Sequence, residues 1–297
     1  MKNILSLLSC LFIIIFFSCE KTITIKQQPY ISKLSIQGLI TPNTKPQIFL
    51  NRTVAYFDPK VNTRDLTVDN ATVTLNDGSL TFTLRFDSIF NTHYCRYDYF
   101  YSNSTNIQTN KTYTLNIIFN GAAYTAFATT NQLKVTPTNI TYIPTFTDLY
   151  GEHEGVVVRY TDIPNEENYY RYQMGRIIDT SVQNASNKLK SICAGNKKYY
   201  ITEIGRTIYS DKNVDGQTVS FVFEPAYTHK TNDTTYIKLQ TVDKNIFNFY
   251  DNLDKQKLAQ YNPFVEPVFI TQGQFKNAIG VFGAYAVSDS VLFIYPE

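Results

Sequence analysis

The sequence has no tryptophan, few cysteines and no excess of charge of either sign, and each absence narrows what the protein can be. Tryptophan gives the largest stacking face, so its absence weakens the case for a sugar-stacking platform. Removal of Lys2 with the apolar N-terminal segment leaves 26 of the 27 Lys and Arg against 25 Asp and Glu, with no basic run. Nucleic-acid binding and electrostatic docking to a membrane are therefore disfavoured.

Two cysteines lie in the body of the chain, Cys95 and Cys193. One well-separated pair does not make a disulfide framework, although an exported chain could oxidise it. We therefore expect two buried thiols and not a bridge.

No set of residues indicates catalysis. The three histidines share no ligand spacing, and the Gly-x-Ser-x-Gly turn of serine hydrolases is absent. A glycosidase needs two carboxylates across a cleft, and Asp162, Glu166 and Glu167 gather near a turn, where acidic residues are common. The sequence predicts no catalytic residue, no cofactor and a protein that is not an enzyme.

One stretch has some of the oxygen ligands of a calcium loop. Asp211, Asn213 and Asp215 alternate before Gly216, as in the first half of an EF-hand loop. The closing carboxylate is missing, because Val222 stands in its place. We interpret the stretch as a hairpin loop with an Asp-Gly turn and predict no metal, with calcium as the weaker alternative.

The N-terminus predicts export. An apolar run extends from Ile4 to Phe17 and would form a helix about 21 Å long, too short for a hydrocarbon core of roughly 30 Å. It is therefore interpreted as a signal peptide over residues 1–18. Ser18-Cys19 then looks like a bacterial lipobox, which makes Cys19 the lipid-attachment residue; an ordinary secretory signal is the alternative.

The remaining chain is rich in residues that favour strands. The full sequence has 23 Tyr and 21 Phe, with abundant Thr, Ile and Val, and aromatic residues make up 15% of it. Alternating runs are separated by turn signals such as Asn76-Asp-Gly78 and Asn120-Gly121. The predicted fold is mostly β, with two β-sandwich-like domains of immunoglobulin or fibronectin type and one amphipathic helix in the second.

The predicted organisation is a signal peptide (1–18), a lipidated tether (19–30), an immunoglobulin-like β-sandwich (31–130) and a C-terminal β-rich domain (131–297) with a helix near 243–260. Asp243 can cap that helix, and apolar residues recur from Ile246 at intervals of three and four. The segments 55–69 and 181–200 are expected to be polar and irregular.

Two runs of tyrosine leave an alternative open. Tyr94, Tyr97, Tyr99 and Tyr101 stand on one expected strand, and Tyr169, Tyr170 and Tyr172 on another. They could form a platform for stacking sugars or peptides. Packing at the edge of a sandwich core, with the hydroxyl in water, is the more common use of such residues and is favoured.

Several stretches together resemble a known family. They are Leu34–Thr41 with Arg52-Thr53, Asp69–Leu75, Asp162–Tyr172, Asn262–Val268 and Gly280–Val287. In order and spacing these are similar to the Bacteroidetes lipoproteins grouped as domain-of-unknown-function 4249. The turn at Ile270–Phe275 departs from the family pattern. The resemblance implies an outer-membrane lipoprotein, often encoded beside a TonB-dependent transporter, with no established activity.

We therefore expect a non-catalytic lipoprotein held in the outer membrane by palmitate and related acyl chains on Cys19. It would act as a binding or accessory component of a TonB-dependent nutrient-uptake system, with its ligand unknown. A surface adhesin or structural protein of the cell envelope is the alternative. Glu20 after Cys19, in place of Asp, offers no inner-membrane retention signal.

Overall fold

Strands dominate the structure, as the composition predicts. The computed structural model describes residues 29–55, 58, 62–148, 151–179, 193, 198–205, 207–225, 229, 231–261, 264 and 273–296. The signal peptide, Cys19 and the tether as far as residue 28 lie outside the described residues, as does the turn Ile270–Phe275 as far as residue 272. Residues Ser32–Glu297 form one unit, described below.

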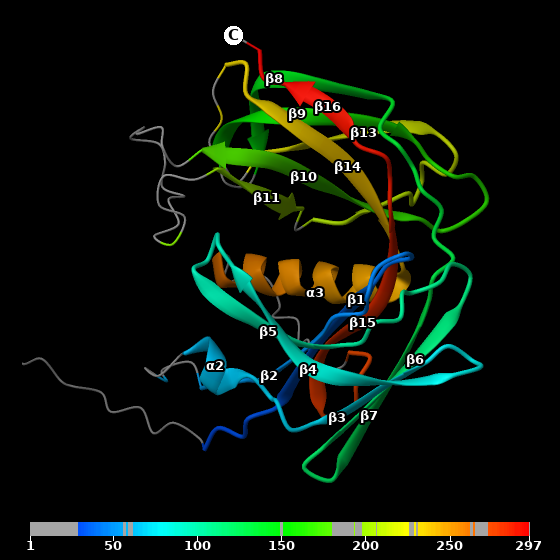
Figure 1. Ribbon diagram of the computed structural model, residues 1–297. Helices are drawn as coiled ribbons and strands as arrows, with labels where there is room; N and C mark the ends of the chain where they lie inside the picture. The colour runs from blue at the N-terminus through cyan, green and yellow to red at the C-terminus, as the bar shows by residue number, and fades with distance from the viewer. Residues whose placement is uncertain are drawn as a thin grey trace, which may run out of the picture. The chain divides into compact units, whose positions relative to one another are not determined.

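Nearly all of the described elements are strands, which come in two groups along the chain (Figure 1). The first group of strands is β1 (Leu34–Ile40), β2 (Ile48–Arg52), β3 (Thr72–Asn76), β4 (Thr81–Asn91), β5 (Arg96–Ser102), β6 (Thr112–Phe119) and β7 (Ala122–Thr129). The second is β8 (Asn139–Asp148), β9 (Gly151–Thr161), β10 (Tyr169–Asp179), β11 (Lys198–Ile204), β12 (Tyr209–Ser210), β13 (Thr218–Phe223), β14 (Thr234–Val242), β15 (Ala278–Val287) and β16 (Val291–Ile294). The helices are α2 (Thr63–Leu66) and α3 (Lys244–Tyr261).

The strands pair into a large sheet and a small one. The large sheet has the order β11-β10-β14-β15-β1-β2-β5-β4-β3-β6-β7, and β12 and β16 add to β10 and β14. The small sheet has the order β13-β9-β8. Most pairs are antiparallel, but β1 and β15 run parallel, with Leu34 opposite Ala278 and Ile40 opposite Ala284.

The parallel pair β1–β15 joins the two ends of the chain in one core. The first core is built from β1 to β7, yet it also contains residues from the end of the chain, Phe275, Ala278, Phe282 and Ala284. The predicted division into two immunoglobulin-like domains near residue 130 is therefore not confirmed. A strand from the expected second domain completes the core of the expected first.

The second core lies between β10, β14 and the small sheet. Tyr160 of β9, Tyr170 of β10 and Phe221 of β13 are among its buried residues. Val156 and Val158 of β9 are fully buried in it. The mostly-β prediction is confirmed, and both sheets contribute an apolar face.

The predicted C-terminal helix is confirmed as α3. Asp243 caps it, because its Oδ1 accepts the backbone N–H of Ile246 at 2.9 Å. Ile246 is fully buried and packs with Val281 of β15 and Tyr169 of β10. The period of three and four thus turns the apolar side of α3 towards the large sheet.

Local turn signals were reliable. Asn120 and Gly121 both have positive φ, 50° and 77°, as a two-residue hairpin turn between β6 and β7 requires. Gly78 has φ of 90° in the hairpin between β3 and β4. Irregular segments were predicted less well, because residues 55–69 contain the short helix α2 and residues 198–204 form β11.

Candidate functional site

The β4–β5 hairpin has a row of aromatic side chains along one face. We call Phe86 and Phe90 of β4 with Tyr97 and Tyr99 of β5 the aromatic row. Phe90 lies opposite Tyr97 in the strand register, and their ring centroids are 5.2 Å apart. Tyr99 stacks on Phe86 at 5.8 Å with nearly parallel rings. Alternation along both strands places these residues on the same face.

The aromatic row runs from the core to solvent. Tyr101, next on the same face of β5, is buried in the first core and touches Phe86 at 5.5 Å. At the far end Phe90 is 44% exposed and Tyr97 is 50% exposed. Tyr94, in the turn, is 58% exposed, as is Ile89 on the opposite face of β4. The tip therefore presents a surface of large apolar side chains to solvent.

Two arginines border this surface. The guanidinium of Arg64, from α2, lies 4.9 Å from the Tyr99 ring centroid and pairs with Asp69 at 2.6 Å. That of Arg96 lies 5.1 Å from the Tyr94 ring centroid. Cations over ring faces are favourable and restrain the rings. Arginine beside tyrosine and phenylalanine is also the composition of protein–protein interfaces.

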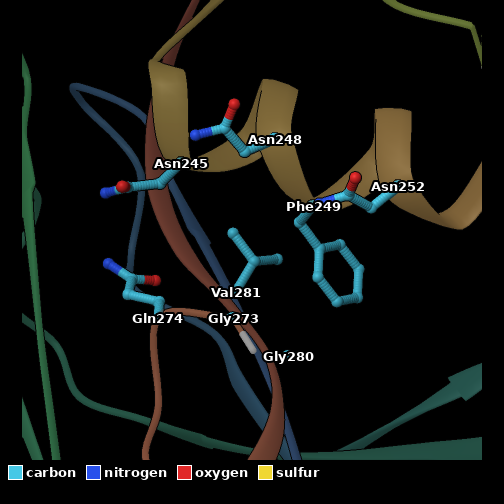
Figure 2. Close-up of a pocket in the computed structure, with 8 residues that line it drawn as sticks. All are labelled: Asn245, Asn248, Phe249, Asn252, Gly273, Gln274, Gly280 and Val281. Carbon is cyan, nitrogen blue, oxygen red and sulfur yellow. The ribbon is translucent and has the colours of Figure 1, made fainter. Parts of the chain in front are cut away.

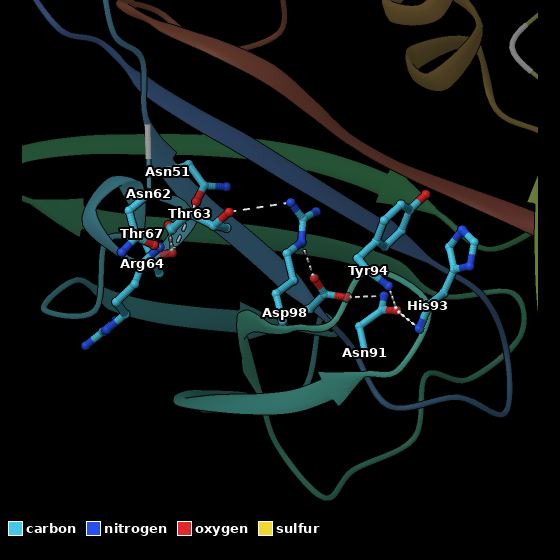
Figure 3. A network of polar contacts seen from close by, with 10 residues as sticks. Asn51, Asn62, Thr63, Arg64, Thr67, Asn91, His93, Tyr94 and Asp98 are labelled. Atoms are coloured by element: carbon cyan, nitrogen blue, oxygen red, sulfur yellow. Dashed lines mark hydrogen bonds and ion pairs between the residues drawn. The ribbon is translucent and has the colours of Figure 1, made fainter. Parts of the chain in front are cut away.

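Polar contacts fix the turn of the hairpin (Figure 3). Asn91 Oδ1 accepts the backbone N–H groups of His93 and Tyr94, at 3.1 and 3.2 Å, and its Nδ2 donates to Asp98 at 2.7 Å. Arg96 approaches Asp98 at 3.5 Å and donates to Thr63 of α2 at 3.4 Å. The network therefore holds both the turn and α2 beside it.

The expectation of two free thiols was wrong. Cys95, in the hairpin turn, forms a disulfide with Cys193, with the two Cα atoms 5.4 Å apart. Cys95 lies in the turn with φ of 53°, and both cysteines are exposed and not buried as expected. A second contact joins the same regions, because His93 Nδ1 lies 3.2 Å from the hydroxyl of Tyr199 in β11. Sequence spacing could not reveal a pair 98 residues apart.

The two predicted runs of tyrosine do not form one platform. Tyr169, Tyr170 and Tyr172 of β10 are all buried, and Tyr172 stacks on Phe223 with centroids 3.6 Å apart. For β10 the packing alternative is confirmed, but the hydroxyls are not in water as expected: that of Tyr170 is buried and donates to Asp162. Tyr94 and Tyr97 of the first run reach the exposed tip, where Phe90, which the sequence reasoning missed, lies beside Tyr97. The alternation of Phe86, Ser88 and Phe90 was the available signal.

The structure gathers part of the weak calcium candidate. Asp211 and Asp215 join Asp162, with one carboxylate oxygen of each within 4.8 Å of the others. Asn213, at φ of 76°, lies in the same loop. From the sequence, Asp162 was expected only in a separate acidic turn. It comes close to Asp211 and Asp215 because β9 pairs with β13, which the sequence did not reveal.

Hydrogen bonds give these carboxylates a structural role. Asp162 accepts the hydroxyl of Tyr170 at 2.5 Å and the N–H of Gly216 at 2.8 Å. Asp211 accepts the N–H of Asn168 at 2.8 Å, and Asp215 that of Asn165 at 2.9 Å. They tie the loop 211–217 to the turn 162–168.

Within this acidic cluster, the surroundings of Asp211 disfavour its ionisation. Burial, with a smaller contribution from the neighbouring Asp162 and Asp215, raises the pKa of Asp211 above its ordinary value, although the N–H of Asn168 acts in the opposite direction. Burial and the bond to Asp162 also raise the pKa of Tyr170, so its phenol stays protonated and donates. The glycosidase candidates Glu166 and Glu167 lie on the exposed side, where Glu167 pairs with Lys244 at 2.9 Å.

Comparison with known proteins places this β-rich chain in a family. Residues 20–290 match the family described as Domain of unknown function (DUF4249), so the chain belongs to that family. No curated protein matches the chain. Among the described residues, no helix has the length and apolar character needed to cross a membrane.

Proposed function

We propose that the chain is a non-catalytic lipoprotein of the outer membrane, anchored through acylated Cys19. It serves as a binding or accessory component of a TonB-dependent nutrient-uptake system. The observation that carries the proposal is the exposed tip of the β4–β5 hairpin, where Phe90 and Tyr97 are about half exposed. Exposed aromatic side chains gathered beside arginines are typical of protein contact sites.

The disulfide supports an exported location. Cys95 and Cys193 are joined at the same hairpin tip. Disulfides persist in oxidising compartments and are rare in the cytosol. The bond and the contact of His93 with Tyr199 both restrain the turn, so the aromatic surface is held in one arrangement before a partner arrives.

An anchor at Cys19 would hold the protein at the membrane. Buried acyl chain contributes about 0.8 kcal/mol per CH₂, and two or more chains give stable attachment. Attachment confines the protein to the plane in which a transporter lies and raises its local concentration there. Even a docking surface of modest size is then effective.

The test is co-purification from native membranes. The tagged full chain is expected to bring down a TonB-dependent transporter, identified by mass spectrometry. The double variant Phe90→Ser and Tyr97→Ser should lose that partner, because a few anchor residues, often aromatic, carry most of the binding energy of an interface, at about 2 kcal/mol or more each. Ile118→Ser is the matched control, since Ile118 is also exposed but lies on β6.

Two outcomes would contradict this role. Isolation of the chain alone from its native membrane would argue against an accessory component. Retention of matrix or host polymers, with no transporter, would favour the surface adhesin. Anchoring is measured separately: labelled palmitate should enter the wild-type chain and not Cys19→Ala, and equal labelling of both would remove the anchor from the proposal.

A further inference from the structure

A hollow of about 290 Å³ lies between α3 and β15 (Figure 2). It is distinct from the aromatic row of β4–β5 and from the acidic cluster. Its volume is near the lower end for ligand pockets, which suits a small ligand.

One face of α3 lines the hollow with amides. Asn245, Asn248 and Asn252 recur at positions i, i+3 and i+7, with Phe249 at i+4. This polar stripe runs beside the apolar stripe that attaches the helix to the sheet. Gln274, before β15, faces it from the other side.

The wall formed by Asn245 and Gln274 is fixed in place. Both side chains donate to the backbone carbonyl of Phe127 in β7, at 2.9 and 3.1 Å. Gln274 Oε1 also accepts the N–H of Phe282 at 2.8 Å. These bonds join α3, β7 and β15 around the hollow, so the wall is organised before any ligand binds.

The opposite part of the hollow keeps free polar groups. Within the described part of the chain, the amides of Asn248 and Asn252 have no hydrogen-bond partner. An amide offers both donors and an acceptor, as a hydroxyl does. Beside them, Phe249 offers apolar surface, and its ring lies next to the buried Val281 in Figure 2.

The chemistry of this lining selects against ions. No charged side chain is among the described residues that line the hollow. An ionic ligand would lose hydration there without gaining a counter-charge. A neutral ring with several hydroxyls matches both the amides and the apolar surface, since its C–H face can rest on Phe249.

We propose that the hollow between α3 and β15 binds a neutral, hydroxyl-rich ligand of the size of one sugar ring. The inference deepens the binding role proposed above, on which it rests, but it requires no transporter. Its test therefore uses the purified full chain, in a detergent without a sugar headgroup. Loss of transporter binding and loss of sugar binding are then separate results.

The measurement is calorimetric titration with glucose, galactose, mannose and N-acetylglucosamine, and with glucuronate as the charged comparison. At least one neutral sugar should bind saturably and more tightly than glucuronate. The double variant Asn248→Ala and Asn252→Ala should weaken that binding at least roughly tenfold, because two amide hydrogen bonds are lost. Asn139→Ala is the matched control on β8 and should bind as the wild type does.

Melting curves distinguish a lost contact from a lost fold. Asn248 is exposed, so the single variant Asn248→Ala should melt as the wild type does and still bind more weakly. The proposal is overturned if no neutral sugar binds, if glucuronate binds more tightly, or if the Asn248 and Asn252 variants bind unchanged.

Discussion

Asp243 makes the stability of this fold depend on pH. It caps α3 through Oδ1, and its Oδ2 accepts the N–H of Ala284 in β15 at 2.7 Å. Burial raises its pKa from 3.8 to about 6, although the backbone N–H groups it accepts act in the opposite direction. The carboxyl is therefore easier to ionise in the unfolded chain than in the folded one.

The sign of the effect follows from that difference. A raised pKa means that the folded state holds the proton more tightly, so stability is greatest below pH 3.8 and falls as pH rises towards 6. The rise from 3.8 to about 6 is worth about 3 kcal/mol in full, at roughly 1.4 kcal/mol for each pKa unit. About 2.4 kcal/mol of this falls between roughly pH 4 and pH 7.5.

The variant Asp243→Asn tests this reasoning. Asparagine is also a good N-cap but carries no titrating proton. Between roughly pH 4 and pH 7.5 the stability of the variant should therefore fall by up to about 2.4 kcal/mol less than that of the wild type. Guanidinium unfolding of both chains at several pH values measures it, and the difference between them removes the contribution of other groups. Asp251→Asn, a helix carboxylate paired with Lys255, is the control. Parallel stability–pH curves for wild type and Asp243→Asn would refute the argument.

Three further predictions concern single features. Reduction of the disulfide, or Cys95→Ser, should lower stability by up to about 4.7 kcal/mol from the entropy of a loop of about 100 residues; guanidinium unfolding with and without reductant measures this, and unchanged midpoints would contradict it. Gly280→Ala should lower the free energy of unfolding by roughly 3–5 kcal/mol, measured by thermal melting, because the added Cβ would meet the carbonyl of Ile36. Gly78→Ala is the control: its added Cβ lies in open space, so the free energy of unfolding should fall by only about 1 kcal/mol. Millimolar calcium should leave the melting temperature unchanged, since the clustered carboxylates already accept hydrogen bonds, and a chelator-reversible rise would show that Asp211 and its neighbours hold the ion.

What could be predicted from the sequence is what depends on neighbouring residues. The cap at Asp243, the turn at Asn120-Gly121 and the alternation that makes strands are local, and all were correct. What failed depends on distant pairings. Asp162 joins Asp211 only because β9 pairs with β13, and no local pattern encodes that register.

The candidate site shows the same contrast. Tyr97 and Tyr99 were placed on one strand correctly, and strand alternation then puts them on the same face. Arg64 was missed, since it reaches the aromatic row from α2 in a segment expected to be an irregular loop. The bond between Cys95 and Cys193 was missed because it joins residues 98 positions apart, a pairing that no local pattern shows.

Because β1 pairs with β15, the first half of the chain depends on a strand from the second half to complete its core. A fragment that ends at residue 130 keeps β1 to β7 but lacks Phe275 and Phe282, which are buried in the same core. Burial of each phenylalanine contributes roughly 1.5–3 kcal/mol, and the hydrogen bonds along β1 are lost as well. Since a whole domain is stable by about 5–15 kcal/mol, we expect residues 31–130 not to fold alone.

Circular dichroism and amide NMR of that fragment, beside the full chain, measure its folding. A matched fragment with residues 273–296 fused through a flexible linker should recover dispersed amide signals, because it restores the missing strand. Cooperative unfolding of residues 31–130 without it would show that the first core closes by itself. Then β15 would be an addition to a complete sandwich and not a part of it.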